Sequence, residues 1–251
     1  MTSRERFRAA INHQEPDRVP IDTGQDLHNG LHEVAYKNLL EHLGEKDEIV
    51  QYDYMQHLAV VKESILTMLH VDTRYIFANG SSSFEFKREA DGSWADEWGV
   101  IRNTCGLYDE SVQHPLAGLN REKLDGYVLP DPRDPARFEG LREKARDLYE
   151  NTDYALIAGS PGTLFFLSSE IVGFQEYMEK LLTDTPLIEE LLDKILEYWI
   201  GFFDGYLEAV GEYVEMIWMG DDWGMQYGPI MNPKLFKAIF KERYRELISS
   251  I

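Results

Sequence analysis

The sequence predicts an α/β fold of the (β/α)8 TIM-barrel type that is incomplete. Short apolar segments alternate with longer segments of helical periodicity, which is typical of parallel strands joined by helices. About four or five such strands are present, whereas a closed barrel contains eight. We therefore expect a single barrel domain over residues 1–251, incomplete at the C-terminus, with an antiparallel hairpin inserted at residues 84–112.

The first third of the chain predicts helices separated by short strands. Thr2 is followed three residues later by Glu5, which is the pattern of a helix N-cap, so we expect a helix to about Asn12. The segments that follow in chain order are a strand at 19–22, a helix at 31–43 ended by Gly44, a less regular strand at 49–54, a helix at 58–69 and a strand at 74–78.

The remainder of the chain begins with the expected hairpin and then becomes more regular. At residues 84–112 aromatic and aliphatic side chains alternate with polar ones, with a turn at 91–93, and a proline-rich connector follows at 129–135. The later segments are a helix at 136–150, a strand at 154–159, a helix at 164–182, a long helix that begins at Thr185-Pro186, a strand at 214–219 and a final helix from Asn232-Pro233.

Composition excludes several classes of protein. The formal net charge of −20 repels a phosphate backbone, so we expect no nucleic-acid partner. No segment reaches the roughly 18 consecutive apolar residues of a membrane span. The single cysteine, Cys105, excludes an internal disulfide, and the charged first residues do not resemble a secretory signal, so we expect a cytoplasmic protein. Because an incomplete sheet exposes unpaired strand edges, a homodimer is one way to cover them.

Polar residues that follow the predicted strands are the candidates for a binding site, because α/β folds bind ligands at the carboxyl ends of their strands. The strongest signal is Gly220-Asp221-Asp222-Trp223-Gly224, followed by Gln226. Two carboxylates after an apolar strand indicate a functional site, although a turn in which they accept loop N–H groups is the alternative. The other candidates are Asp22, Gln25 and His28 after the first strand and Asn79 after the third.

The histidines do not predict a metal site. His28 and His32 lie four residues apart and would share one face of a helix, but no third ligand accompanies them. Two solvated or hydrogen-bonded histidines at a helix start are therefore the favoured interpretation, and we assign no metal ligand.

Several segments resemble the uroporphyrinogen decarboxylase superfamily, in the order that this family has them. They are Asp17-Arg18-Val19-Pro20-Ile21-Asp22, Asp96-Glu97-Trp98-Gly99-Val100, His114-Pro115-Leu116, Asp131-Pro132, Gly220-Asp221-Asp222-Trp223-Gly224-Met225-Gln226 and Asn232-Pro233. The resemblance spans essentially the whole chain. It implies a (β/α)8 barrel of which this sequence is the N-terminal two-thirds.

Within that family the residues differ from those of a true decarboxylase. Its two substrate-binding arginines correspond to Gln25 and Asn29, its catalytic tyrosine to Leu167, its serine to Asp222 and its aspartate to Asn79. Because uroporphyrinogen carries several carboxylates, a pocket that has lost these guanidinium groups does not suit it. The sequence is therefore more similar to the methyltransferase branch, which moves methyl groups between a small methylated compound or a thiol and a corrinoid.

The methyltransferase resemblance implies roles for particular residues. Asp22 and Asp222 would be catalytic, and the substrate-binding residues would be Asp221, Gln226, His28, Gln25, Asn79 and Trp223. It also implies a zinc ion and a corrinoid protein as partner for the full-length protein, with the zinc ligands expected after Ile251. The alternatives are a decarboxylase of porphyrin biosynthesis and a non-catalytic or truncated binding protein that is stable as a homodimer.

Overall fold

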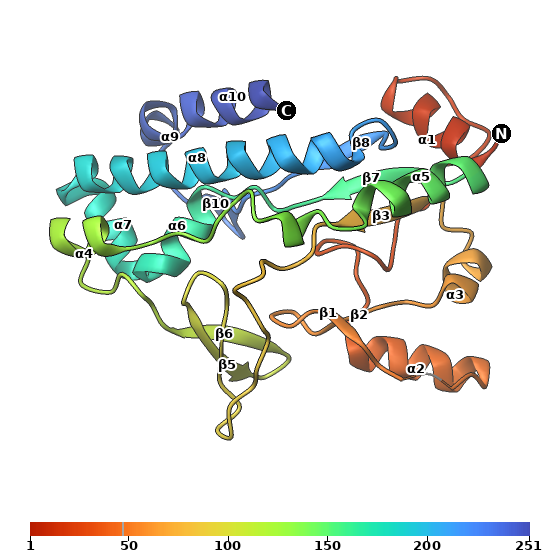
Figure 1. Ribbon diagram of the computed structural model, residues 1–251, viewed down its shortest axis with the longest axis horizontal. Coiled ribbons are helices and arrows are strands. Elements are labelled where there is room, and N and C mark those ends of the chain that lie inside the picture. Colours follow the sequence, from red (N-terminus) through yellow and green to blue (C-terminus); the bar gives the residue numbers. More distant parts are fainter. Residues whose placement is uncertain (47) are drawn as a thin grey trace.

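The computed structural model describes residues 1–46 and 48–251. A three-stranded parallel sheet and the helices around it form one layer, and antiparallel strands with α2 form a smaller layer beside it (Figure 1). The helices are α1 (Ser3–Ile11), α2 (Glu33–Leu43), α3 (Glu63–Met68), α4 (Arg121–Gly126), α5 (Leu141–Asn151), α6 (Phe165–Val172), α7 (Phe174–Thr183), α8 (Thr185–Val210), α9 (Pro233–Ile239) and α10 (Lys241–Ser250), with a 3-10 turn at Pro135–Arg137. The strands are β1 (Gln51–Asp53), β2 (Leu58–Ala59), β3 (Thr73–Phe77), β4 (Trp94–Ala95), β5 (Ile101–Cys105), β6 (Tyr108–Gln113), β7 (Ala155–Gly159), β8 (Met216–Trp218), β9 (Gly224–Met225) and β10 (Gly228–Pro229).

The parallel sheet has the order β3-β7-β8. Thr73 lies opposite Ala155 in the first pair of strands, and Ala158 lies opposite Ile217 in the second. Every residue of β7 is buried, as expected for a central strand covered on both faces. Since all three strands run the same way, their carboxyl ends meet at one edge of the sheet.

Helix α8 organises the largest hydrophobic core. It runs along the long axis of the molecule (Figure 1) and contacts α5, α6, α7 and α10. The sequence predicted a long helix that begins at Thr185-Pro186, and the structure confirms it, with an apolar face buried along its length. The Trp199 indole donates a 2.8 Å hydrogen bond to the carbonyl of Thr163, which ties this helix to the segment after β7.

Residues 19–22, the first predicted strand, are held by the buried carboxylate of Asp72. The capping box of Thr2 and Glu5 is confirmed at the start of α1, but residues 19–22 do not form a strand. The amide of Ile21 instead donates to the side chain of Asp72 at 2.8 Å, and the carbonyl of Ile21 accepts from the Asp72 amide at 2.8 Å. Arg6 and Arg18 also donate to this carboxylate, so the segment is held by charge as well as by backbone hydrogen bonds.

The smaller layer is antiparallel. It contains the second predicted strand, which was expected in the parallel sheet. Residues in the 49–54 segment form β1, which pairs with β2 and lies outside the parallel sheet. Within the expected insertion, β5 and β6 form a hairpin and β4 adds a third strand. The β5–β6 hairpin turns at Gly106, where φ is +71°, and the turn predicted at residues 91–93 is also present, since the Gly92 amide donates to the Glu89 carbonyl at 3.0 Å.

Four predicted helices are shorter or interrupted. The helix expected at 58–69 begins only at α3, since Leu58–Ala59 pair as β2. The helix at 164–182 divides into α6 and α7 at Gly173, whose φ of +96° cannot continue a right-handed helix. The 136–150 segment is interrupted at Gly140, where φ is +73°, and the final helix divides into α9 and α10 at Phe240, whose φ of −103° lies in the right-handed region.

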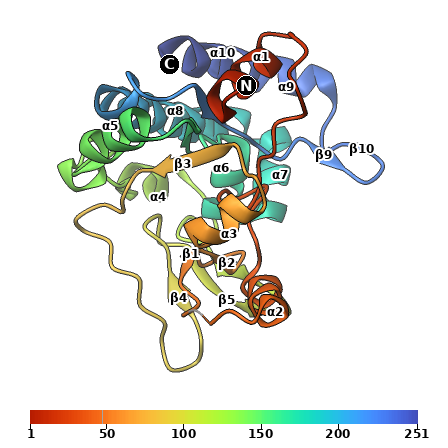
Figure 2. The ribbon, with the colours of Figure 1, turned by 90° about the vertical axis from the view of Figure 1, so that its right-hand side faces the viewer.

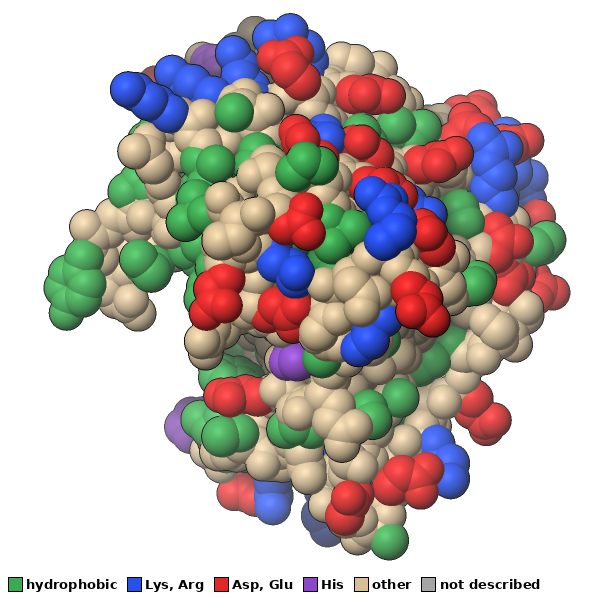
Figure 3. Space-filling model, turned by 90° about the vertical axis from the view of Figure 1, so that its left-hand side faces the viewer, with side chains coloured by type: hydrophobic (Ala, Val, Ile, Leu, Met, Phe, Trp, Pro, Cys, Tyr) green, Lys and Arg blue, Asp and Glu red, His purple; other side chains and the backbone are tan. Residues whose placement is uncertain are grey.

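The structure thus shows a mixed α/β fold with a parallel sheet covered by helices. The described residues contain three parallel strands, fewer than the four or five expected, and they do not form a closed eight-stranded barrel. None of the described helices has the length and apolar character needed to cross a bilayer. Acidic and basic side chains are interspersed over the face that Figure 3 shows.

Candidate functional site

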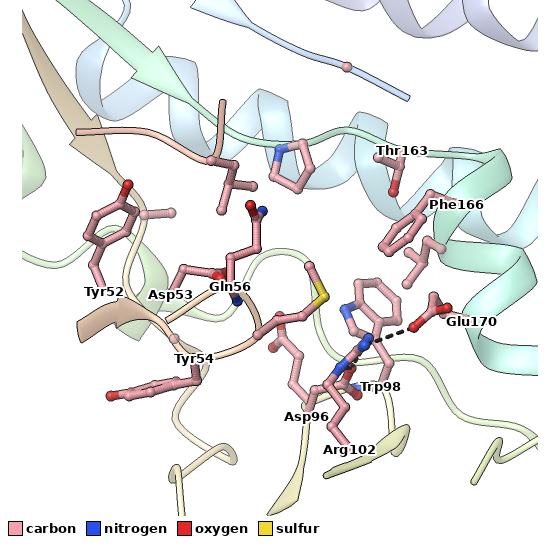
Figure 4. Close-up of a pocket in the computed structure, with 18 of the residues that line it drawn as sticks. Tyr52, Asp53, Tyr54, Gln56, Asp96, Trp98, Arg102, Thr163, Phe166 and Glu170 are labelled. Carbon is pink, nitrogen blue, oxygen red and sulfur yellow. Dashed lines mark hydrogen bonds and ion pairs between the residues drawn. The ribbon is translucent and has the colours of Figure 1, made fainter. Parts of the chain in front are cut away.

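A cavity of about 900 Å³ lies where the parallel sheet meets the antiparallel layer (Figure 4). The segments that follow the parallel strands supply one wall, with Asn79 after β3, Thr163 after β7 and Gly220 after β8. Residues 52–56 and the β4–β5 region supply the opposite wall. The cavity therefore occupies the edge at which α/β folds bind their ligands.

Aromatic side chains make up much of the cavity wall. They are Tyr52, Tyr54, Phe84, Trp94, Trp98, Phe166, Trp199 and Trp218. The ring of Trp98 packs edge-on against Tyr198, with centroids 4.6 Å apart, so its position is fixed by the α8 core. Such rings provide apolar and polarisable surface, which suits methyl groups and small aromatic or cationic compounds.

Carboxylates outnumber cations in this cavity. Six acidic residues line it: Asp53, Asp96, Glu97, Glu170, Asp221 and Asp222. Among the described lining residues, the only arginines or lysines are Arg102 and Arg137. The site is therefore acidic, and neither arginine was placed there from the sequence.

Both arginines are already neutralised by cavity carboxylates. Arg102 donates to Glu170 at 2.8 Å and to Asp96 at 3.1 Å, which Figure 4 shows. Arg137 donates to Glu97 at 2.6 Å. Arg102 and Glu170 are 68 residues apart in the sequence, so no local pattern could have predicted their pairing. Neither guanidinium group is left free to bind the carboxylates of a ligand.

Three cavity carboxyls, those of Asp53, Asp96 and Asp221, have a raised pKa. Burial raises the pKa of Asp53, which accepts from the Gln56 amide at 2.6 Å. Burial also raises the pKa of Asp96, although Arg102 opposes that change. Carboxyls of this kind keep their protons to higher pH than exposed ones, which reduces the repulsion among the acidic groups.

The two successive aspartates have different surroundings. Asp221 accepts hydrogen bonds from the amides of Leu164, Phe165 and Phe166 at 2.7 to 2.9 Å, and also from the Tyr244 hydroxyl. It therefore holds the first turn of α6, and burial raises its pKa. Asp222 is exposed and its side chain lies at the cavity wall. Of the pair, Asp222 has the freer carboxylate.

The other candidates after the first and third strands make mainly internal contacts. Asp22 accepts from Thr73 at 2.6 Å and from Tyr75 at 2.9 Å, and it does not line the cavity. Gln25 donates to the carbonyl of Thr73 at 2.8 Å. Asn79 lines the cavity, but its side-chain nitrogen donates to two carbonyls of the segment that carries the 3-10 turn.

Trp223 and Gln226 lie outside the cavity lining. Trp223 packs among the rings of Phe165, Phe236 and Phe240, with centroids 4.7 to 5.0 Å apart. Gln226 is exposed in the turn between β9 and β10, a hairpin that projects from the molecule in Figure 2. The structure therefore does not bring these two residues together with Asp222 and His28.

His28 is the one histidine at the cavity wall, among the residues described. Its ring packs against Trp218 at the end of β8, with centroids 4.0 Å apart. Asp26 lies behind it, buried, with Nδ1 of His28 3.6 Å from Oδ2 of the carboxyl. Asp26 follows the first predicted strand but was given no role from the sequence, because no local pattern shows which of several acidic residues in a loop will be buried.

His28 and His32 do not share a helical face. His32 is the N-cap of α2, where its Nδ1 accepts from the Val34 amide, whereas His28 lies in the preceding loop. In the described part of the chain, no group of three or more His, Cys, Asp or Glu side chains is placed to hold a metal ion.

No protein-family model and no curated protein matches the sequence. Among solved structures, a methyltransferase from Methanosarcina mazei is similar, with a TM-score of 0.61 and 18% sequence identity. The alignment covers 100% of this chain and 67% of that one. At this identity the likeness concerns the fold alone. The whole length of this chain shares the mixed α/β fold of the aligned part of that methyltransferase.

Proposed function

We propose that the chain is a methyltransferase of the barrel type, resembling the uroporphyrinogen decarboxylase superfamily, that acts on a small methylated compound. A corrinoid protein is the proposed partner in methyl transfer. The observation that carries the proposal is the acidic, ring-lined cavity at the carboxyl ends of the parallel strands. The fold shared with the Methanosarcina mazei methyltransferase supports it.

The charge of the cavity disfavours the decarboxylase alternative. A substrate with several carboxylates would meet six acidic residues, and both arginines of the lining are paired with acidic side chains. Binding it would break buried ion pairs, which costs several kcal/mol for each charge left unpaired. A small neutral methylated compound needs no such exchange, because the aromatic rings can hold it.

Zinc is not assigned to the described residues. The resemblance implies a zinc ion in the methyltransferase branch, but the described side chains do not provide three ligands in one place. The proposal therefore gives these residues the tasks of binding and orienting the methyl donor and of excluding water from it.

The proposal is tested by a direct assay of both activities. The protein is incubated with reduced cobalamin and small methylated donors, and formation of methylcobalamin is followed by its absorbance. A parallel sample receives uroporphyrinogen and is analysed for coproporphyrinogen. We expect methyl transfer, whereas coproporphyrinogen without methyl transfer would establish the alternative, and neither product would favour a binding protein.

A pair of variants localises the activity. Trp98→Ala removes a ring from the cavity wall, and we expect a loss of donor binding of about tenfold or more, given the value of aromatic contacts. Val128→Ala is the control, because Val128 is 85% exposed and does not line the cavity. Equal effects of the two changes would contradict the assignment of the cavity.

A further inference from the structure

A buried carboxyl lies behind the cavity wall without a full set of partners. The side chain of Asp26 is 1% exposed, and among the described residues Oδ1 has no hydrogen-bond partner. The surrounding loop is closed on itself, since Oδ1 of Asn29 accepts from the amides of Gln25 and Asp26 at 3.0 and 2.9 Å. The Tyr52 hydroxyl donates to the Asp26 carbonyl at 2.8 Å and holds the loop from the other side. A carboxyl buried in this way is unfavourable unless it is protonated or faces a cation.

His28 connects this carboxyl to the cavity. Nδ1 of its ring faces Asp26 at 3.6 Å, and the side chain is 58% exposed where it lines the cavity. The ring packs against Trp218 in a tilted arrangement, with an angle of 56° between the ring planes. Nε2 lies beside Gly220, where an added Cβ would approach it to 3.5 Å. One nitrogen therefore faces the buried carboxyl and the other faces the loop after β8.

The surroundings favour exchange of a proton between these two groups. Burial raises the pKa of Asp26, the nearby Asp22 raises it further, and His28 lowers it. Tyr52 and Tyr75 also face this carboxyl, and burial raises the pKa of both phenols, so they stay protonated near neutral pH. Of these neighbours, the His28 ring lies 3.6 Å from the Asp26 carboxyl and lowers its pKa, so His28 is the group that we pair with Asp26.

We propose that His28 and Asp26 form a proton-sharing pair that protonates the oxygen leaving from a methyl ether. The inference rests on the proposed methyl transfer and names its substrate class. The methyl carbon forms a bond to the electron pair of a nucleophilic acceptor, a thiolate or the reduced cobalt of a corrinoid. The carbon–oxygen bond breaks, and the oxygen keeps its electron pair and takes the proton from Nε2 of His28. The imidazole becomes neutral, and a proton from solvent restores it.

The charge of the cavity explains why the oxygen must leave as an alcohol. An alkoxide or phenolate would carry a negative charge in a lining where acidic residues outnumber basic ones and both arginines are already paired, which opposes its formation. Protonation during bond breaking removes that charge. A quaternary ammonium donor would leave as a neutral amine and would need no acid. Asp26 is a positioning residue here, because it acts through the ring of His28.

The pair is tested first without a substrate. The titration of the Asp26 carboxyl is followed by 13C NMR in the full chain, in its His28→Gln variant and in His42→Gln as an exposed control. We expect His28→Gln to move the midpoint to higher pH, because the ring lowers the pKa of Asp26, and His42→Gln to leave it unchanged. A midpoint that His28→Gln does not move overturns the pair.

The proton transfer is tested with methoxybenzenes and reduced cobalamin. General acids contribute about 100-fold or more to such steps, so His28→Gln is expected to slow transfer from unsubstituted methoxybenzene by that factor. With 4-nitromethoxybenzene, whose phenolate is a weak base, the loss is expected to be less than about tenfold. Asp26→Asn should show the same dependence on the leaving group, with a smaller loss.

The outcomes separate the inference from the proposed function. Equal losses on both donors, or no loss, would overturn the acid role of His28 while methyl transfer stands. If the unchanged protein transfers no methyl group from either methoxybenzene but does so from another small methylated donor, the methyl-ether inference falls while the proposed function stands. If it transfers none from any methylated donor, both fall.

Discussion

Replacing Asp109 tests how much its buried carboxylate stabilises the antiparallel layer, which forms one wall of the cavity. Asp109 is 2% exposed and accepts hydrogen bonds from the Trp94 indole at 2.6 Å, from Arg88 at 2.8 Å and from His57 at 3.0 Å. Burial alone would raise its pKa, but these donors and Thr104 outweigh burial and lower the pKa from 3.8 to about 2. The folded state is therefore stabilised when this group is ionised.

The size of the effect follows from that difference in pKa. Each pKa unit corresponds to about 1.4 kcal/mol, so ionised Asp109 contributes about 2 kcal/mol to the free energy of unfolding near neutral pH. The contribution is present above pH 4 and is lost as the pH falls through about 2, with about half remaining at pH 3. Asp109→Asn should lower the free energy of unfolding by about 2 kcal/mol at pH 7 and by about half as much at pH 3.

The assay is urea unfolding of the original chain and of Asp109→Asn at pH 7, 4 and 3. Glu110→Gln is the control, since Glu110 is the exposed neighbour on the same strand and should change stability by less than about 0.5 kcal/mol. The reasoning would be refuted by an Asp109→Asn effect that is the same at all three pH values, or that is below about 0.5 kcal/mol at pH 7.

The remaining predictions concern a buried ion pair and two glycines. Arg102→Met leaves two partly buried carboxylates without their cation and should lower the free energy of unfolding, measured by urea titration, by about 3 kcal/mol. Arg142→Met removes the cation of an exposed ion pair and should change this free energy by less than about 1 kcal/mol. Gly173→Ala should cost about 3 kcal/mol, because φ is +96° and the new Cβ would meet His114 at 2.9 Å. Gly106→Ala has positive φ but open space around it, so a cost of about 1 kcal/mol is expected, and equal thermal shifts for the two glycines would show that contact with His114 is unimportant.

Local signals in the sequence predicted the elements whose formation depends on neighbouring residues. The capping box of Thr2 and Glu5, the proline that opens α8 and the apolar run of β7 were each read directly, because caps, φ restriction and periodicity act over a few residues. The sequence also predicted that polar residues after the strands approach a common site. Asn79 and Asp222 both line the cavity, in agreement with that expectation.

Contacts between distant segments decided what the sequence could not. Residues 19–22 and 49–54 were both expected to join the parallel sheet. Instead, residues 19–22 are bound by the carboxylate of Asp72, and residues of the 49–54 segment pair with strand β2. The roles of the acidic residues were decided in the same way, since burial behind His28 distinguishes Asp26 from the other acidic residues of its loop. By itself the sequence determined an acidic α/β protein, the starts of α1 and α8, and the central strand. Only the tertiary structure determined which charges are paired and which remain available, because burial and ion pairing depend on segments far apart in the chain.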